Sequence, residues 1–265
     1  MTLRHRPWAE QPPGFNIGLR PIEPAHWLEG GGADAERKAR LRLKHPDLVW
    51  GETEGSRAGQ EEVLRLVEAK TGQRGDPALE PLWAASLLVA DDLCLMERRE
   101  AGWTLTAVSL CSPTFFTVAE SLGKPLRGLH EPVPNFEERF LWRVERMFDN
   151  LPADRIVERR NWTVLNSDEL FLPSSGPIRA LIPEIRPSRA QDELYVRVER
   201  QTLRVLETGG ILFTIRIWMD KLAELRGHPE LMTAFAKAWR EAPQDFRSYK
   251  GLAHYDQLIE AFLAG

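Results

Sequence analysis

The sequence predicts an α+β fold in which an antiparallel sheet is flanked by helices. Apolar residues recur at helical spacing in the first and last parts of the chain, whereas short strand-like runs are grouped in the middle. The strand candidates are joined by short turns, which pair strands antiparallel. This grouping favours an α+β fold over a doubly wound parallel sheet, and we expect the helices on one face of the sheet.

Helices are expected before, between and after the strands. Val63 and Val67 have helical spacing, and the candidate at 78–90 follows Asp76-Pro77, a cap and a first-turn proline. The expected helices cover 34–45, 60–70, 78–90 and 135–150, followed by two C-terminal stripes, Leu231-Phe235-Trp239 and Tyr255-Leu258-Ile259-Phe262.

Five strands are expected, and two turns join four of them into hairpins. The segment 98–102 is short enough to connect two strands, and Glu207-Thr208-Gly209-Gly210 is a good hairpin signal. The expected strands cover 93–96, 104–111, 156–165, 194–202 and 211–218. Residues 1–32 look irregular because Pro12-Pro13-Gly14 and Gly30-Gly31-Gly32 interrupt them, so this arm is either a flexible tail or a strap over the domain.

Composition excludes several classes of partner. The chain has 35 basic and 39 acidic residues, a net charge of −4, and its basic residues are dispersed, so we expect no nucleic acid and no anionic membrane. The N-terminus lacks the apolar core of a signal peptide, and no apolar run approaches the roughly 20 residues of a membrane span. Cys94 and Cys111 are then two buried free thiols of a cytoplasmic protein.

His130 is the most informative of the six histidines. It is followed by Glu131-Pro132-Val133-Pro134, and the two prolines stiffen the backbone directly after it. A rigid loop that holds one imidazole suits an axial ligand to haem iron. It also suits a structural histidine bonded to a backbone carbonyl, and the residues alone favour that second interpretation.

Charged residues also alternate along the strand candidate at 194–202. Arg197, Glu199 and Gln201 point to one face of that strand, and Arg200 points to the other. The paired strand adds Thr214 and Arg216 on a common face. Inward charges need a partner or a bound group, whereas a solvated face with a salt bridge is the ordinary alternative.

Several blocks of the chain together resemble one protein family. The two most specific blocks are His130-Glu131-Pro132-Val133-Pro134 and Arg197-Val198-Glu199-Arg200-Gln201-Thr202-Leu203. Further blocks are Gly18-Leu19-Arg20-Pro21-Ile22, Asp92-Leu93-Cys94-Leu95-Met96, Leu122-Gly123-Lys124-Pro125-Leu126, Asn161-Trp162-Thr163 and Ile211-Leu212-Phe213-Thr214-Ile215-Arg216. In this order they resemble the α-subunit-like proteins of haem-dependent oxidative N-demethylases.

The resemblance implies a fold, a cofactor and a reaction. It implies a PAS-like haem-binding domain over 17–265, with additional N- and C-terminal helices, after an N-terminal arm at 1–16. The cofactor is haem b, and the reaction is oxidative N-demethylation of a small methylated amine with O2, which releases formaldehyde. Electrons come from an NADPH-dependent partner reductase that carries flavin and an iron–sulfur cluster.

The same resemblance implies roles for five residues. His130 is the candidate metal ligand to the haem iron, and Glu199 is the candidate catalytic group near the substrate. Arg197, Arg200 and Arg216 are candidates for contacts with the haem propionates or the substrate, without ranking among them.

One departure from the family pattern concerns the pocket. Family members carry an aromatic-Pro-Ser-Arg-Trp run after the second strand, whereas this chain reads Ser112-Pro113-Thr114-Phe115-Phe116. If the missing Arg or Trp contacts haem or substrate, the pocket is changed. Two alternatives to the enzyme therefore stay open: a non-catalytic PAS-like haem sensor and a haem-free binding subunit.

Overall fold

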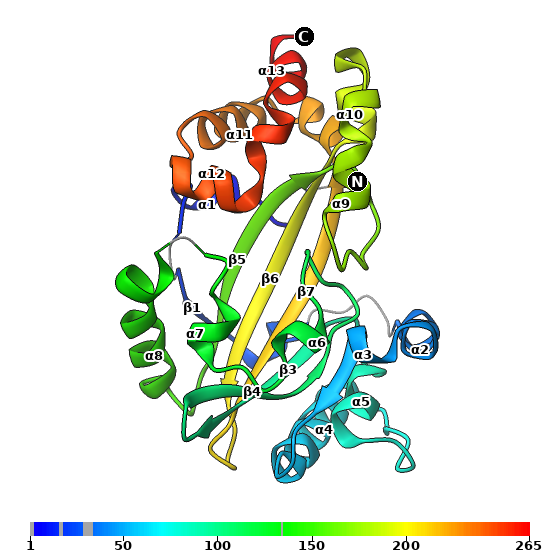
Figure 1. Ribbon diagram of the computed structural model, residues 1–265, viewed down its shortest axis with the longest axis vertical. Helices are drawn as coiled ribbons and strands as arrows, with labels where there is room; N and C mark the ends of the chain where they lie inside the picture. Colours follow the sequence, from blue (N-terminus) through cyan, green and yellow to red (C-terminus); the bar gives the residue numbers. More distant parts are fainter. Residues whose placement is uncertain (1–2, 16–17, 29–33, 134) are drawn as a thin grey trace.

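The computed structural model describes residues 3–15, 18–28, 34–133 and 135–265. At its centre lies a seven-stranded antiparallel sheet with the strand order β1-β5-β6-β7-β3-β4-β2 (Figure 1). The strands are β1 Arg20–Ile22, β2 Trp50–Glu52, β3 Asp92–Arg99, β4 Gly102–Ser109, β5 Ile156–Leu165, β6 Tyr195–Val205 and β7 Ile211–Lys221. The predicted class, a mixed fold with an antiparallel sheet flanked by helices, is confirmed.

All five predicted strands and both predicted hairpins are present. The strands β6 and β7 pair from Val205 opposite Ile211 to Tyr195 opposite Lys221, and Gly209 in their turn has a φ of +85° that disfavours other residues. The strands β1 and β2 were not predicted. Each has three residues, which is too short to show an alternating pattern.

The helices are mostly short. The α-helices are α1 Pro7–Glu10, α2 Ala35–Lys44, α3 Pro46–Val49, α4 Arg57–Thr71, α5 Pro81–Ser86, α6 Val118–Ser121, α7 Leu126–Leu129, α8 Trp142–Asp149, α9 Gly176–Ala180, α10 Ala190–Glu193, α11 Pro229–Arg240, α12 Gln244–Lys250 and α13 Asp256–Ala264. Single-turn elements are η1 Pro24–His26, the π-helical η2 Glu137–Leu141, η3 Ile182–Glu184, η4 Pro187–Arg189, η5 Leu222–Gly227 and η6 Leu252–Tyr255. No helix among the described residues is both long and apolar enough to cross a membrane.

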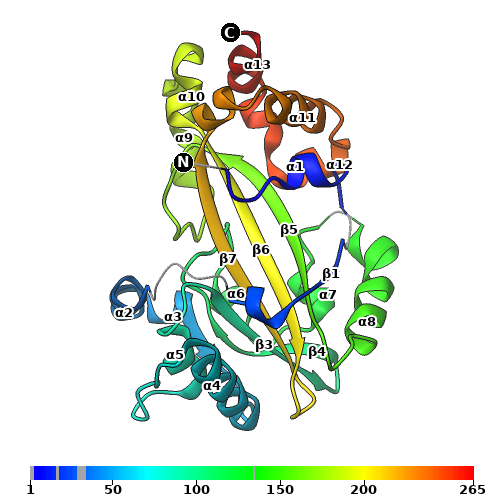
Figure 2. The ribbon, with the colours of Figure 1, turned by 180° about the vertical axis from the view of Figure 1, so that it is seen from behind.

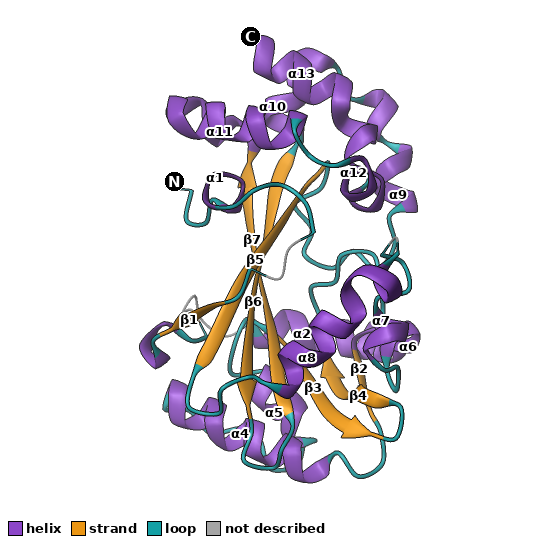
Figure 3. Ribbon diagram, turned by 90° about the vertical axis from the view of Figure 1, so that its left-hand side faces the viewer, coloured by secondary structure: helices purple, strands orange, loops and turns teal. Residues whose placement is uncertain are grey.

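Helices cover both faces of the sheet, so the expectation of one covered face is wrong. Cys94 and Met96 of β3 pack with apolar residues of α6, α7, η2 and α8 on one face. Leu93 and Leu95 of the same strand pack with α4 and α5 on the other. The strand is apolar on both sides, and each side needs a cover. Figures 1 and 2 view the two sides, and Figure 3 is turned by 90° from Figure 1.

The long strands β5, β6 and β7 run on into a helical cap at the C-terminal end of the molecule (Figure 1). The described part of the N-terminal arm belongs to this cap. Trp8 of α1 is 3% exposed and meets the rings of Trp162 and Phe235 edge-on at 5.9 and 6.0 Å. Of the two interpretations of the arm, residues 3–15 therefore form a strap. The predicted boundary between residues 16 and 17 and the breaker Gly30-Gly31-Gly32 lie outside the described residues.

Candidate functional site

The register of the sheet sorts the charged residues onto its two faces. Glu199 of β6 lies opposite Asn161 of β5 and Ile217 of β7, and the neighbouring Arg200 lies opposite Arg160 and Arg216. Because side chains alternate along a strand, Arg197, Glu199 and Arg159 share one face, here called the front face. Arg160, Arg200 and Arg216 share the rear face. The front face is the one covered by α6, α7, η2 and α8.

His130 ends helix α7 with one ring nitrogen already engaged. Its Nδ1 lies 2.9 Å from the carbonyl oxygen of Leu126, and its ring stacks on Phe136 with centroids 4.2 Å apart and planes 5° apart. A carbonyl only accepts, so Nδ1 carries the proton and Nε2 carries the lone pair. Nε2 makes no hydrogen bond with any described residue.

Burial and charge keep this imidazole neutral. Burial lowers the pKa of His130, the charge of Arg159 lowers it further, and the bond to Leu126 opposes them without reversing the shift. A neutral imidazole whose second nitrogen is fixed by a backbone carbonyl is the usual state of a metal ligand. The bond to a backbone carbonyl that the structural interpretation of His130 predicted is present, and it orients the ring and leaves Nε2 without a bond to a described residue.

Glu199 is held by a hydroxyl that also contacts Arg197. Thr114 Oγ1 donates to Glu199 Oε1 at 2.8 Å and accepts from Arg197 Nε at 2.9 Å, while Gln201 donates to Oε2 at 3.1 Å. Burial by itself raises the pKa of Glu199. Lys250, Arg197, the Thr114 bond and Arg159 together outweigh burial and lower that pKa below its ordinary value. Glu199 is therefore a carboxylate at neutral pH.

Arg197 is fully buried, and its guanidinium N–H groups donate mainly to the backbone of two loops. Besides Thr114, it donates to backbone carbonyls, namely those of Ser112, Pro113, Glu169 and Leu170, at 2.8 to 3.2 Å. Such a guanidinium positions the loops beside Glu199. One of these loops contains Ser112–Phe116, the segment that departs from the family pattern. This sequence difference therefore lies directly at the candidate site.

Two further cations face Glu199, and the sequence did not predict them. Arg159 of β5 and Lys250 at the end of α12 both act on the pKa of Glu199, and Arg159 also lowers the pKa of Lys250. Burial lowers the pKa of both, while Glu199 opposes it. Neither makes a hydrogen bond or an ion pair with a described residue, and Arg159 Nε is buried. Pairing of β5 with β6 would have indicated Arg159, whereas nothing in the sequence brings α12 to the sheet.

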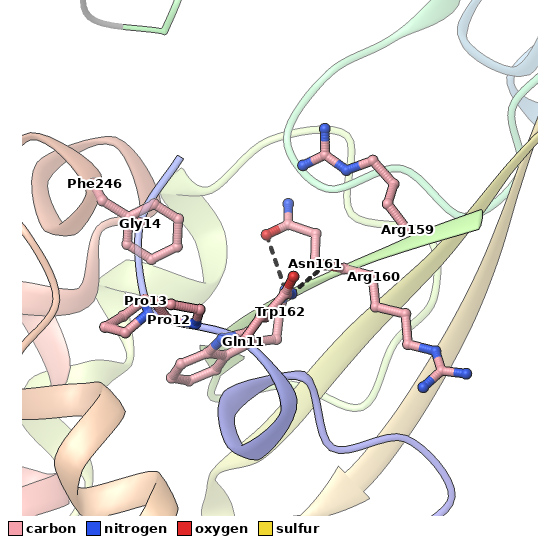
Figure 4. Close-up of a pocket in the computed structure, with 9 residues that line it drawn as sticks. All are labelled: Gln11, Pro12, Pro13, Gly14, Arg159, Arg160, Asn161, Trp162 and Phe246. Atoms are coloured by element: carbon pink, nitrogen blue, oxygen red, sulfur yellow. Dashed lines mark hydrogen bonds between the residues drawn. The ribbon is translucent and has the colours of Figure 1, made fainter. Parts of the chain in front are cut away.

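A groove runs along the open edge of β5 beside Arg159. Its volume is about 580 Å³, and its lining includes Phe15 and Leu19 of the arm together with Arg159 and Arg160. Figure 4 shows a smaller pocket at this edge, in which Arg159 and Arg160 point in different directions from the strand. The volume falls within the range of about 300–1,000 Å³ that small-molecule sites occupy.

The rear-face arginines belong to a separate cluster. Arg200 is 1% exposed and donates from Nε to Glu158 at 2.7 Å. Arg216 stands directly across from Arg200 and has its guanidinium 5.0 Å from the ring of Trp218. The sheet thus separates Arg200 and Arg216 from His130 and Glu199, with which the sequence had grouped them.

The two cysteines are the free, buried thiols that were predicted. Burial raises the pKa of Cys94, and it raises the pKa of Cys111 to about 12. Both are therefore protonated thiols. Among the described residues, no three His, Cys, Asp or Glu side chains converge as they would around a metal ion. Haem iron is compatible with this arrangement because it needs a single protein ligand.

The fold and site define a domain in which one neutral imidazole, one carboxylate and two cations without partners face the same side of a sheet. Residues 45–260 match the sequence model of the haem-dependent oxidative N-demethylase, alpha subunit-like family. The chain belongs to this family, as its motifs indicated. The family description names a haem-dependent oxidative activity and an α-subunit.

Proposed function

We propose that this protein is the haem-binding subunit of an oxidative N-demethylase that acts on a small methylated amine. The observation that carries the proposal is His130, whose Nδ1 is fixed by Leu126 and whose Nε2 has no hydrogen bond among the described residues. Family membership supplies the haem-dependent activity. The domain is PAS-like in this proposal, with the hairpin β3-β4 placed beside the last strand β7 of the sheet.

The residues present fit a haem. His130 Nε2 would ligate the iron, and Phe136 fixes the plane of the imidazole by stacking on it. Bound haem b supplies the activation of O2 and the oxidation of the N-methyl carbon, which ends in formaldehyde and the demethylated amine. The residues Arg200 and Arg216, on the rear face, do not reach a haem that is bound by His130.

Glu199 binds and orients the amine. Its carboxylate is ionised at neutral pH, so it attracts a protonated amine and accepts a charge-assisted hydrogen bond from it. Thr114 and Gln201 leave lone pairs of both carboxylate oxygens free, because each oxygen accepts one bond from them. The same carboxylate accepts a proton from the bound ammonium when the neutral amine is needed.

Electrons come from a separate reductase in this proposal. The chain has no glycine fingerprint for a dinucleotide, and its two cysteines are fewer than the four ligands of a conventional iron–sulfur cluster. A flavin and iron–sulfur protein that oxidises NADPH would supply them.

Absorption spectra of the purified protein, oxidised and dithionite-reduced, test the cofactor. We expect a Soret band that His130→Ala weakens strongly, whereas His254→Ala, a change at an exposed histidine, leaves it unchanged. An unchanged band and haem content in His130→Ala would rule out His130 as the ligand. Formaldehyde release from methylamines should require added reductase. Sustained release with NADPH but without reductase would contradict the need for a partner reductase.

A second candidate is a haem-binding subunit without demethylase activity. The departure at Ser112–Phe116 favours it, because this loop supplies the Thr114 hydroxyl that holds Glu199. A protein that has the haem spectrum but releases no formaldehyde with a competent reductase would support this candidate.

A further inference from the structure

Three cations and one carboxylate converge at the front face. The strand register puts Arg159 and Arg197 on the same face as Glu199, and Lys250 lies over the ring of Tyr249, which contacts Phe15 of the groove that Arg159 lines. All three cations act electrostatically on Glu199. The cluster therefore carries a surplus of two positive charges in a partly buried place. Such a surplus is unfavourable unless an anion compensates it, because burial disfavours each charge that lacks a partner.

The surplus resides on Arg159 and Lys250. Arg197 is committed to Thr114 and the loop carbonyls, so it has no donor left for a ligand. Arg159 and Lys250 make no hydrogen bond or ion pair with any described residue. Arg159 lies on the groove, and Lys250 contacts the ring of Tyr249 at 5.6 Å. These two side chains keep their full donor capacity for an anion.

The neighbouring Arg160 shows that the chain pairs such arginines where no ligand is needed. Arg160 donates to Glu10 at 2.9 Å and to Glu158 at 3.0 Å. Arg159, one residue earlier on the same strand, has no such partner. Arg159 and Arg160 therefore lie on opposite faces of the sheet. Arg159, which has no such partner, lies on the face that His130 also occupies.

We propose that Arg159 and Lys250 form a two-cation anchor for the paired propionates of the porphyrin. The inference rests on the proposed function. A porphyrin carries two carboxylates at one edge, which equal the two surplus charges in number and are opposite to them in sign. The arginines that sequence analysis had suggested are either committed, as Arg197 is, or on the rear face, as Arg200 and Arg216 are.

The anchor also affects how Glu199 can bind the substrate. With both cations neutralised by propionates, Glu199 is offset only by Arg197 among the three cations, and it forms no ion pair with Arg197. Its charge is then available to an ammonium group of the substrate. The cofactor thereby removes the positive surplus of the cluster, which would otherwise repel a protonated amine.

Titration of the apoprotein with iron protoporphyrin IX and with its dimethyl ester tests the anchor, because the ester lacks both charges. Wild-type protein should bind the diacid at least tenfold more tightly than the ester. Arg159→Gln and Lys250→Met should each reduce this preference roughly tenfold. The exposed controls Arg155→Gln and Lys237→Met should keep it. The ratio of two affinities within one variant is insensitive to a general loss of stability.

The outcomes separate the anchor from the function on which it rests. His130→Ala should weaken both porphyrins alike and leave the preference intact. Variants Arg159→Gln and Lys250→Met that retain the wild-type preference would overturn the anchor while the haem proposal stands. Wild-type protein that binds neither porphyrin would overturn both.

Discussion

The two faces of the sheet hold two clusters of the same composition, one glutamate among three cations. On the rear face, Glu158 accepts from Arg20 at 2.7 and 2.9 Å, from Arg160 at 3.0 Å and from Arg200 at 2.7 Å. On the front face, Glu199 accepts from Thr114 and Gln201, and it forms no ion pair with a described cation. Each of the three rear cations bonds to its glutamate, whereas none of the three front cations does.

This difference distinguishes a structural ion cluster from a binding site. In both clusters burial raises the pKa of the glutamate and the surrounding cations lower it below the ordinary value. The pKa values alone therefore do not tell them apart. What separates them is whether the cations form ion pairs with the glutamate, because a cation without such a pair near a groove is available to a bound molecule.

The largest effect is expected from opening the closed cluster. Glu158→Gln leaves Arg200 buried beside a neutral amide, so it should cost about 3–5 kcal/mol of unfolding free energy. Glu199→Gln should cost about 1 kcal/mol, because Glu199 forms no ion pair with a described cation that the change would break. Urea unfolding at pH 7 measures both. Equal losses would show that the two clusters are equally structural.

A buried carboxylate on the rear side provides the next test. Asp91 is 1% exposed, neither oxygen has a hydrogen-bond partner among the described residues, and burial raises its pKa to about 6 against the opposing charges of Arg216, Lys38 and Arg200. The folded state thus favours the protonated acid. Its stability is full below the ordinary pKa of 3.8 and falls as pH rises toward 6.

Asp91→Asn should remove this penalty. The variant should be more stable than wild type by up to about 3 kcal/mol at pH 8 and equal to it below pH of about 4. Unfolding in urea at the two pH values measures the difference. Asp92→Asn is the matched control: burial raises the pKa of Asp92 too, but its two oxygens accept from the backbone nitrogens of Cys111 and Ser112, and an amide keeps only one acceptor oxygen, so Asp92→Asn should gain less stability at pH 8 than Asp91→Asn. A change in stability that is the same at both pH values in Asp91→Asn would contradict the raised pKa of Asp91.

The open cluster should respond in binding rather than in folding. In haem-loaded protein, Glu199→Gln should weaken the binding of dimethylamine roughly tenfold, because the charge-assisted bond to the ammonium is lost. Spectral titration measures the affinity, and Glu241→Gln, at an exposed position, serves as the control. Equal affinity in Glu199→Gln would place the substrate elsewhere.

The smallest effect concerns the hydroxyl between Arg197 and Glu199. Thr114→Val removes one bond to each, so we expect a loss of about 1 kcal/mol and a higher pKa of Glu199. A lowered carboxyl pKa stabilises the fold above its ordinary value of 4.5, and that contribution disappears as pH falls through the folded pKa. Acid unfolding of Thr114→Val should therefore begin at higher pH, whereas Thr114→Ser should resemble wild type. Identical acid transitions in the two variants would contradict the role of the hydroxyl.

The strands show how far local pattern reaches. Strand β5 was predicted at 156–165 and occupies those residues, because apolar and β-branched residues mark both of its ends. The helix predicted at 78–90 is shorter and covers Pro81–Ser86. The apolar run continues beyond the helix, so the run alone does not show where the helical hydrogen bonds end. The prediction of helices on one face failed because the order of elements does not say which side each helix covers.

The sequence by itself determined the class of fold and the family, and it proposed the two residues around which the candidate site is described, His130 and Glu199. A rigid loop and a strand parity are local properties, so both can be read along the chain. Only the tertiary structure decided which cations accompany them. Arg159 comes from the neighbouring strand and Lys250 from the C-terminal cap, and Arg200 and Arg216 are separated from Glu199 by the thickness of the sheet. Whether a charged side chain is already paired or can bind a ligand depends on residues that lie far away in sequence. Only folding brings these residues together.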